Sequence, residues 1–293
     1  MNQTMSQLLA SFHGGSAASA INSILSIAPS SSPSVVLAPN GAGVMPALSE
    51  LRGFTTDGHG TLYVVNAYKN FSQILTFAPP KVSGGPWTFL SVFAGGKDSE
   101  LAHPFCAAFG SDGHLYVSNQ DPNSKGTIAV TYYEGPTMKH PGQLKGVFAD
   151  GFVGLRGIAT NGTAWYVADA GDAKTAGSVS IFDAKGKKQT SLGVNQPVHL
   201  LYDGSKYLYI GSEKDNAVYQ YDTTGSATTV SPFIKSGSTP PIDHTGGLAI
   251  VDGSFYVASR VGMAINQYPL AQPASGSVFV SGLADNPEFI SQI

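Results

Sequence analysis

One short pattern recurs five times along the chain and limits what the chain can fold into. Each copy has a large apolar residue, a tyrosine, a β-branched residue, usually a small residue, and a small polar residue. The copies lie at residues 62–66, 115–119, 165–169, 208–212 and 255–259. Such residues favour β-strands, and a repeat of about 50 residues is typical of architectures whose units bury their faces only against their neighbours.

The sequence around each copy predicts four antiparallel strands per repeat. A strand of small and apolar residues precedes each copy, and a Gly-rich turn such as 57–60 or 111–113 joins the two as in a hairpin. An alternating strand follows each copy. A fourth strand ends the repeat at 92–96, 147–151, 232–235 and 278–282, with a weaker counterpart at 189–192. Four such strands describe a β-propeller blade.

Both ends of the chain are needed to complete the ring. Residues 286–291 are predicted to form a first strand, and 7–12, 22–27 and 34–37 the second, third and fourth strands of the same blade. Closing a ring with both termini removes an exposed sheet edge. An amphipathic helix over residues 5–30 is the alternative. We therefore predict an all-β fold, a single six-bladed propeller with blades at 5–40 plus 285–293, 48–96, 103–151, 154–194, 196–237 and 244–283.

The pattern Pro-x-Gly-apolar-Ala, followed by Asp-Gly-x-Leu-Tyr-Val-(Ala/Ser)-(Asp/Asn), resembles the NHL-type repeat. It is also similar to the related six-bladed propellers of the gluconolactonase and strictosidine-synthase kind. Residues 104–119 and 155–169 carry the resemblance best. It covers about 240 residues, but these motifs specify an architecture and say almost nothing about activity.

Charge and composition limit which binding partners and which cellular location we expect. The net charge of −3 and 12% charged residues leave no basic stripe for nucleic acid, and no apolar run is long enough to span a membrane. We expect a monomer that binds a small polar or anionic ligand. The low charge suits a secreted or periplasmic protein whose signal peptide is absent from this chain; otherwise the protein is cytoplasmic. Cys106, the single cysteine, is expected to be a buried small hydrophobe.

Ionisable side chains gather where the predicted innermost strands begin. These strands line the channel of a propeller, and ligands usually occupy such a mouth. The residues there are Glu50, Arg52, His103, Phe105, Arg156, Gln196, His199, His244, Asn286 and Glu288. His103, His199 and His244, with Glu288, could hold a divalent metal, zinc rather than calcium, with one position open to water. Alternatively, these histidines cap strand ends by hydrogen bonding to the backbone.

Two resemblances bear on this site. The peptide-amidating lyases, also six-bladed propellers, are similar in that three inner-strand histidines bind a catalytic zinc. Those histidines directly follow a proline, a position that Phe105, Val198 and Glu288 hold here. The resemblance to gluconolactonases implies a calcium at the mouth, for which Asn66, Asn119 and Asp169 could be ligands. Alternatively, these three residues and Phe105 could contact the substrate. Asn and Asp are also ordinary turn residues.

Arg52 and Arg156 occupy equivalent positions two blades apart. Two guanidiniums facing a channel suit a carboxylate, phosphate or enolate, although each could instead pair with Glu50 or Glu288. One hypothesis is therefore a metal-dependent hydrolase, such as a lactonase, or a lyase. In it the arginines hold an anionic substrate, and Glu288 or Glu50 is the general base. The other is a binding or scaffold propeller that recognises a ligand or protein at the same mouth. The charge gathered at the axis favours the enzyme.

Overall fold

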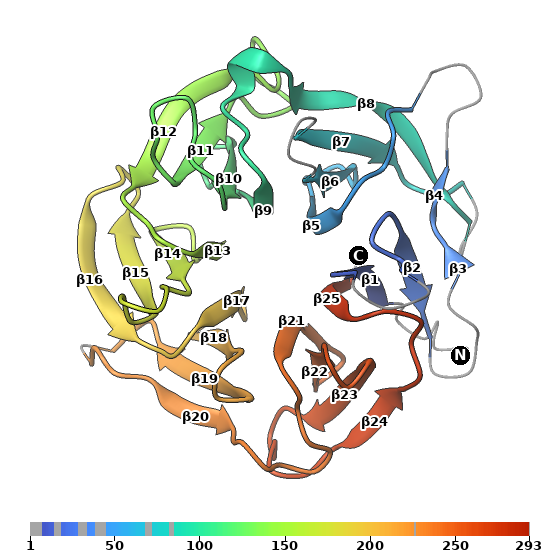
Figure 1. The fold of residues 1–293 in the computed structure, drawn as a ribbon, viewed down its shortest axis with the longest axis vertical. Helices are drawn as coiled ribbons and strands as arrows, with labels where there is room; N and C mark the ends of the chain where they lie inside the picture. The colour runs from blue at the N-terminus through green and yellow to red at the C-terminus, as the bar shows by residue number, and fades with distance from the viewer. Residues whose placement is uncertain are drawn as a thin grey trace.

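The fold is a ring of six sheets around a central axis, seen end-on in Figure 1. The computed structural model describes residues 8–14, 19–28, 34–38, 45–67, 72–81, 85–225 and 227–292. Within these residues each blade has four antiparallel strands, and one blade gains a fifth strand. The all-β, six-bladed prediction is confirmed. In the described part of the chain, no helix is long and apolar enough to cross a membrane.

The strands follow the predicted repeats, counted from the innermost strand outward. Blade one has β25 (Pro287–Gln292), β1 (Leu8–Phe12), β2 (Ile24–Ile27) and β3 (Ser34–Val35). Blades two and three have β5 (Leu51–Thr56), β6 (Leu62–Asn66), β7 (Gln73–Ala78) and β8 (Trp87–Gly95), then β9 (Pro104–Phe109), β10 (Leu115–Asn119), β11 (Ala129–Tyr133) and β12 (Leu144–Asp150). A 3-10 helix, η1 (Lys97–Ser99), lies between them.

The remaining blades repeat this order. Blades four and five have β13 (Leu155–Thr160), β14 (Ala164–Asp169), β15 (Ser178–Asp183) and β16 (Lys188–Gly193), then β17 (Pro197–Tyr202), β18 (Tyr207–Ser212), β19 (Ala217–Asp222) and β20 (Ser231–Ile234). Blade six has β21 (Thr245–Val251), β22 (Ser254–Ser259), β23 (Ala264–Pro269) and β24 (Ser277–Val280). The weakly predicted strand at 189–192 is therefore present as β16.

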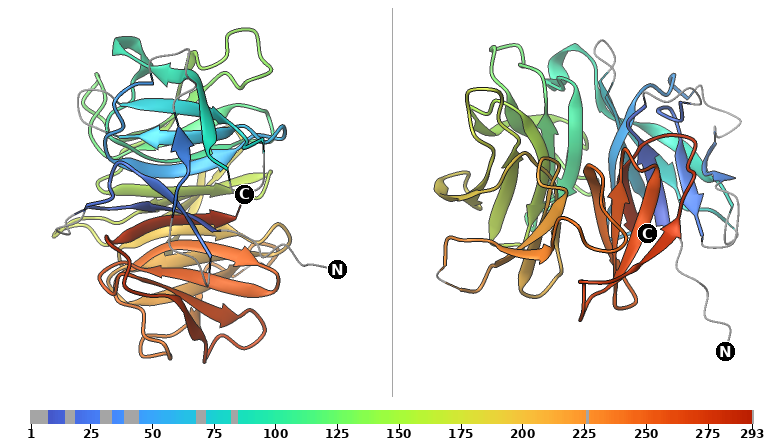
Figure 2. Two further views of the ribbon diagram at one scale, coloured as in Figure 1. Left: turned by 90° about the vertical axis from the view of Figure 1, so that its right-hand side faces the viewer. Right: turned by 60° about the horizontal axis from the view of Figure 1, so that its bottom comes forward.

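Both termini complete blade one, as predicted. β25 pairs with β1 from Leu8 opposite Gln292, and Figure 2 shows the red C-terminal strand beside the blue N-terminal one. The helical alternative over residues 5–30 is wrong for the described residues, because β1 and β2 lie there; Gln7 lies outside them. The fourth strand differs from the prediction. It ends after two residues, and the chain crosses to blade two as β4 (Leu37–Ala38), parallel to β8.

In blades two and three the recurrent tyrosine links the second strand to its hairpin turn. The Tyr116 hydroxyl donates to Asp112 at 2.9 Å, and that of Tyr63 donates to Asp57 at 3.3 Å. The same rings pack between blades; Tyr116 lies 4.1 Å from Trp165 between ring centroids. The repeat pattern thus combines a turn residue with the tyrosine that caps it and fills the space between blades.

The six inner strands touch one another in ring order around the axis. At their third position, residues with a side chain alternate with glycine: Phe289, Gly53, Cys106, Gly157, His199 and Gly247. A Cβ added at Gly53 would lie 2.9 Å from the Phe105 carbonyl oxygen, and one at Gly157 2.6 Å from that of Val198. Glycine on alternate blades therefore lets neighbouring inner strands approach.

Three rings from blades one, three and five meet on this axis. The ring centroid of Phe105 lies 5.2 Å from that of Phe289 and 5.5 Å from that of His199. The centroids of His199 and Phe289 are 4.2 Å apart. All three side chains are buried. This aromatic plug fills the axis beneath the charged residues of the mouth.

Candidate functional site

The second residue of each inner strand forms one layer directly around the axis. In blade order these residues are Glu288, Arg52, Phe105, Arg156, Val198 and Gly246. We call this set the axial layer. It contains Glu288, Arg52, Arg156 and Phe105 of the predicted site residues. The repeat thus gives these four the same position in their inner strands, and Phe105 also belongs to the aromatic plug.

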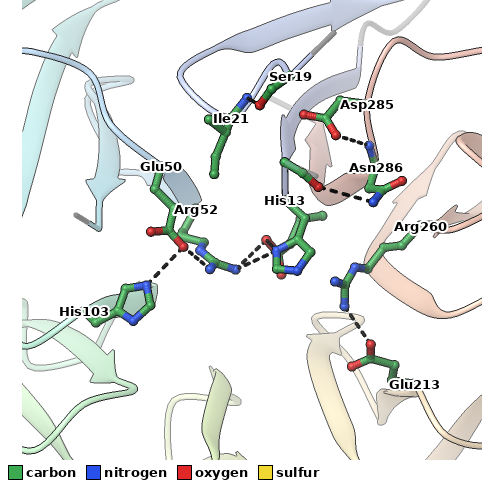
Figure 3. A network of polar contacts seen from close by, with 12 residues as sticks. His13, Ser19, Ile21, Glu50, Arg52, His103, Glu213, Arg260, Asp285 and Asn286 are labelled. Carbon is green, nitrogen blue, oxygen red and sulfur yellow. Dashed lines mark hydrogen bonds and ion pairs between the residues drawn. The ribbon is translucent and has the colours of Figure 1, made fainter. Parts of the chain in front are cut away.

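Arg52 and Glu288 form a buried ion pair, and Figure 3 shows Arg52 between Glu50 and His13. Nη1 of Arg52 lies 2.6 Å from Oε2 of Glu288, whose side chain is 2% exposed, and Nδ1 of His13 lies 3.4 Å from the same oxygen. Burial raises the pKa of Glu288, but Arg52 and His13 outweigh it and hold the pKa far below its usual range. This carboxylate stays ionised and is a weak base.

Arg52 also contacts a second group of charged side chains. Nη2 of Arg52 contacts Glu50, and Oε1 of Glu50 lies 3.0 Å from Nε2 of His103. Nδ1 of His103 lies 3.6 Å from Asp121. Burial raises the pKa of Glu50, but hydrogen bonds from His103 and Arg52 lower it below its usual value. His103 therefore lies between two carboxylates at the rim.

The backbone before the inner strands fixes these side chains. Glu50 and His103 each directly precede an inner strand and have left-handed φ values of 57° and 51°, as do Gln196 and His244 in their blades. The carbonyl of His103 accepts a hydrogen bond from the N–H of Gln120 at 3.0 Å, and Glu50 does the same in its blade. Non-glycine residues hold such a conformation only where the surrounding structure enforces it.

A pocket of about 270 Å³ opens beside His103. It is lined by Gly96, residues 100–103 and residues 121–124. Asp121 and His103 lie next to each other in this lining, and Glu100, also in the lining, accepts a hydrogen bond from the backbone N–H of Ser124 at 2.9 Å. His103 can thus meet a molecule in this pocket while Glu50 holds its other ring nitrogen.

Arg156 has different surroundings from Arg52. Its Nη1 donates to the Leu155 carbonyl oxygen at 3.2 Å, and no carboxylate of the described residues lies within ion-pairing distance of it. Its Cζ lies 5.7 Å from the centroid of the Phe105 ring, and that of Arg52 lies 5.6 Å from the same centroid. Burial lowers the pKa of Arg156, and nearby Arg52 contributes to the lowering while Glu288 opposes it.

The structure does not bring the three predicted metal-binding histidines together. His103 and His244 precede their inner strands, whereas His199 is the third residue of β17, so they occupy different levels of the repeat. Nδ1 of His244 lies 2.9 Å from Asp243 in an exposed position. Among the described residues, no group of three His, Cys, Asp or Glu side chains could hold a metal ion. The arrangement does not fit a three-histidine zinc site, and no chemistry here is assigned to a metal.

His199, a member of the aromatic plug, and Cys106 are both buried. Burial lowers the pKa of His199 to about 3, so its ring is neutral, and Nε2 has no partner among the described residues. Burial raises the pKa of the Cys106 thiol to about 11. Cys106 thus behaves as the expected buried hydrophobe.

Asn66, Asn119 and Asp169 are the last residues of second strands, and they brace the chain before the first strand. A side-chain oxygen of each accepts a hydrogen bond from the backbone N–H two positions before its inner strand, at 2.8, 3.0 and 3.1 Å. Asn66 and Asn119 are buried. Their oxygens therefore have structural partners, and the predicted contact with calcium or substrate stays a prediction.

Sequence reasoning missed His13 and Arg260. Each directly follows a second strand, as Glu213 does in blade five, and Nη1 of Arg260 lies 2.9 Å from Oε1 of Glu213. Figure 3 shows this pair across the mouth from His103. Alignment of the repeats on their second strands would have found these positions.

Comparisons with known proteins support the fold and no family. No protein-family model and no curated protein match the chain. A chain of a solved nidogen/laminin complex superimposes with a TM-score of 0.70 at 11% identity, over 98% of this chain and 97% of that one. A functionally unknown protein from Desulfotomaculum acetoxidans gives 0.61 at 14% identity, over 98% and 85%. The computationally designed protein Ika8 gives 0.50 at 12% identity, over 92% and 74%. Identities this low show the propeller fold alone, and the NHL and gluconolactonase resemblances stay predictions.

Proposed function

We propose that the protein binds a small organic anion at the mouth of the channel and that Arg156 is its anchor. One observation carries this proposal. Arg156 is a partly buried guanidinium without a carboxylate partner in the described part of the chain, whereas the equivalent Arg52 has two. Removing a charge from water without a counter-charge is costly. A ligand carboxylate would supply that counter-charge.

The chemistry of the site suits a carboxylate. A guanidinium presents its N–H donors as a planar fork that matches the two oxygens of a carboxylate. The only donated hydrogen bond recorded for Arg156 within the described residues is the one to its neighbour's carbonyl. The aromatic plug fills the axis below, so we expect a ligand of a few heavy atoms that enters from the mouth.

Calorimetric titration with acetate, lactate and succinate tests the proposal. We expect Arg156→Gln to weaken binding by about tenfold or more, because hydrogen bonds to a charged group are lost. Lys145→Gln removes the same charge from an exposed pair with Glu134 and should leave binding unchanged. Equal affinities of wild type and Arg156→Gln for all three acids would refute the proposal.

A second candidate is a hydrolase or lyase in which His103 transfers a proton without a metal. It is favoured by the position of His103 between Glu50 and Asp121, beside the pocket. His103 would act as general base because the pKa of Glu288 and that of Glu50 are both lowered. A panel of lactones and esters tests it: His103→Gln should abolish turnover and retain anion binding. Turnover by His103→Gln at the wild-type rate would exclude this role.

The metal and the protein partner stay predictions with tests of their own. Elemental analysis of the untagged protein decides the metal. One equivalent of zinc that is lost in a His103→Ala/His199→Ala variant would restore the metal-dependent mechanism, and calcium would direct attention to Asn66, Asn119 and Asp169. The solved nidogen/laminin structure is a complex between proteins. A protein partner at this mouth becomes the leading function if no organic anion binds.

A further inference from the structure

We propose that the anion carries two acidic groups and that Arg260 binds the second, which makes the ligand a short dicarboxylate. This inference rests on the proposed function, since it assumes that Arg156 binds the first carboxylate. It adds a second subsite across the mouth and a substrate class.

All the arginines of the chain converge on the axial layer. The chain has only three arginines, Arg52, Arg156 and Arg260. The first two belong to this layer through β5 and β13. In blade six the layer position is Gly246, and a Cβ added there would lie 2.9 Å from Cγ of Arg260. The stem of Arg260 thus occupies the place of the missing side chain, and blades two, four and six each supply one guanidinium.

The two flanking arginines are held differently. Arg52 is 6% exposed and contacts Glu50 and Glu288. Arg260 has one carboxylate partner, Glu213, which is 25% exposed, while Nε of both arginines is buried without a partner among the described residues. A partly exposed pair is held weakly compared with a buried one. Arg260 can therefore exchange Glu213 for a ligand carboxylate, whereas Arg52 cannot exchange the buried Glu288.

The ion pairs of the three arginines leave two positions at which a ligand carboxylate could bind. Glu288 and Glu50 pair with Arg52, and Glu213 pairs with Arg260 from a partly exposed position, so Arg156 alone has no carboxylate partner among the described residues. One ligand carboxylate would neutralise Arg156, and the second would replace Glu213 at Arg260. The neighbouring members of the layer, Phe105 and Val198, are buried and their side chains carry no polar atom, so nothing in the layer calls for a polar group between the two acidic groups. The length of the linker is left to the titration series.

Calorimetric titrations compare a monocarboxylate with dicarboxylates of increasing length, using acetate, malonate, succinate and glutarate, with inorganic phosphate as a further probe. We expect at least one dicarboxylate to bind about tenfold tighter than acetate, because a second charge-assisted contact forms. Arg260→Gln should reduce this dicarboxylate to the affinity of acetate and leave acetate unchanged. Glu213→Gln should act in the opposite direction and strengthen the dicarboxylate, because the internal competitor for Arg260 is gone.

The outcomes separate this inference from the proposed function. Acetate binding that depends on Arg156, without a preference for any dicarboxylate, would overturn the Arg260 subsite and keep the anchor. Phosphate tighter than every dicarboxylate would overturn the ligand class. If the wild type binds none of these anions, both proposals are overturned. Should Arg260→Gln fail to fold, Glu213→Gln decides alone, and an unchanged dicarboxylate affinity in that variant refutes the subsite.

Discussion

Arg52 and Arg156 stand in the same local sequence, Leu-Arg-Gly, at the same position of β5 and β13, yet their surroundings differ. Arg52 follows Glu50 by two residues, whereas Arg156 follows a glycine by two, Gly154. In the neighbouring blades, Glu288 lies on one side of Arg52, whereas Arg156 has Phe105 and Val198 as its neighbours. The repeat thus places a guanidinium, and residues from other blades decide whether it stabilises the fold or is left for a ligand.

The largest expected effect is the loss of stability when Arg52 is removed. Arg52→Gln removes the guanidinium from Glu288, which is 2% exposed and keeps only its contact with His13 at 3.4 Å. Breaking a buried pair in this way costs about 3–5 kcal/mol of the free energy of unfolding. Arg156→Gln, the matched variant, breaks no ion pair and should cost less than about 1 kcal/mol. Chemical denaturation measures both. Similar losses in the two variants would break the comparison.

A double variant separates the charge from the packing. Arg52→Gln/Glu288→Gln removes both buried charges, so it should be more stable than Arg52→Gln alone. A recovery of about 2 kcal/mol would show that the uncompensated carboxylate causes most of the loss. No recovery would assign the loss to the packing of the Arg52 side chain.

The glycines that follow the two arginines should respond alike, because the backbone around them is the same. A Cβ at Gly53 or at Gly157 would press on the backbone of the next inner strand. Gly53→Ala and Gly157→Ala should each cost about 1–3 kcal/mol, as expected for overpacking. Gly58→Ala is the control, since nothing lies within 4 Å of its added Cβ. A tolerated change at either inner position would contradict the close approach of the strands.

The smallest effect is on the pH dependence of stability. The pKa of His199 falls from 6.5 to about 3 on folding, so the unfolded chain binds the proton first and stability declines as pH drops below 6.5. The pKa of Glu288 is lowered from 4.5, so its contribution is lost only below pH 4.5. We expect His199→Phe to flatten the upper part of the decline, measured by urea denaturation between these two values. An unchanged slope there would show that His199 is not the group responsible.

Much of the architecture could be predicted because it depends on local patterns. The repeated Leu-Tyr-Val unit predicts the second strands, and the unpaired strand at 286–291 predicts the closure of blade one. The site depends on register and on contacts between blades. His103, His199 and His244 come from equivalent segments but from different positions within them, so their convergence could not be judged from the sequence.

Arg260 is a second example of a position that could not be predicted from the sequence. It lies in the loop after β22, outside the inner strands, and reaches the axial layer only because Gly246 leaves room. A strand pattern predicts where the backbone runs, but the path of the Arg260 side chain depends on the absence of a side chain at Gly246.

The most direct test observes the arginines themselves. Because the chain has three arginines, its Nε–Hε nuclear magnetic resonance spectrum should contain three signals, which single Arg→Lys variants would assign. On titration with succinate, we predict that the Arg156 signal shifts progressively, that the Arg260 signal follows, and that the Arg52 signal stays in place. A shift of the Arg52 signal with the Arg156 signal unmoved would contradict the account, because the ligand would then bind Arg52 and not Arg156.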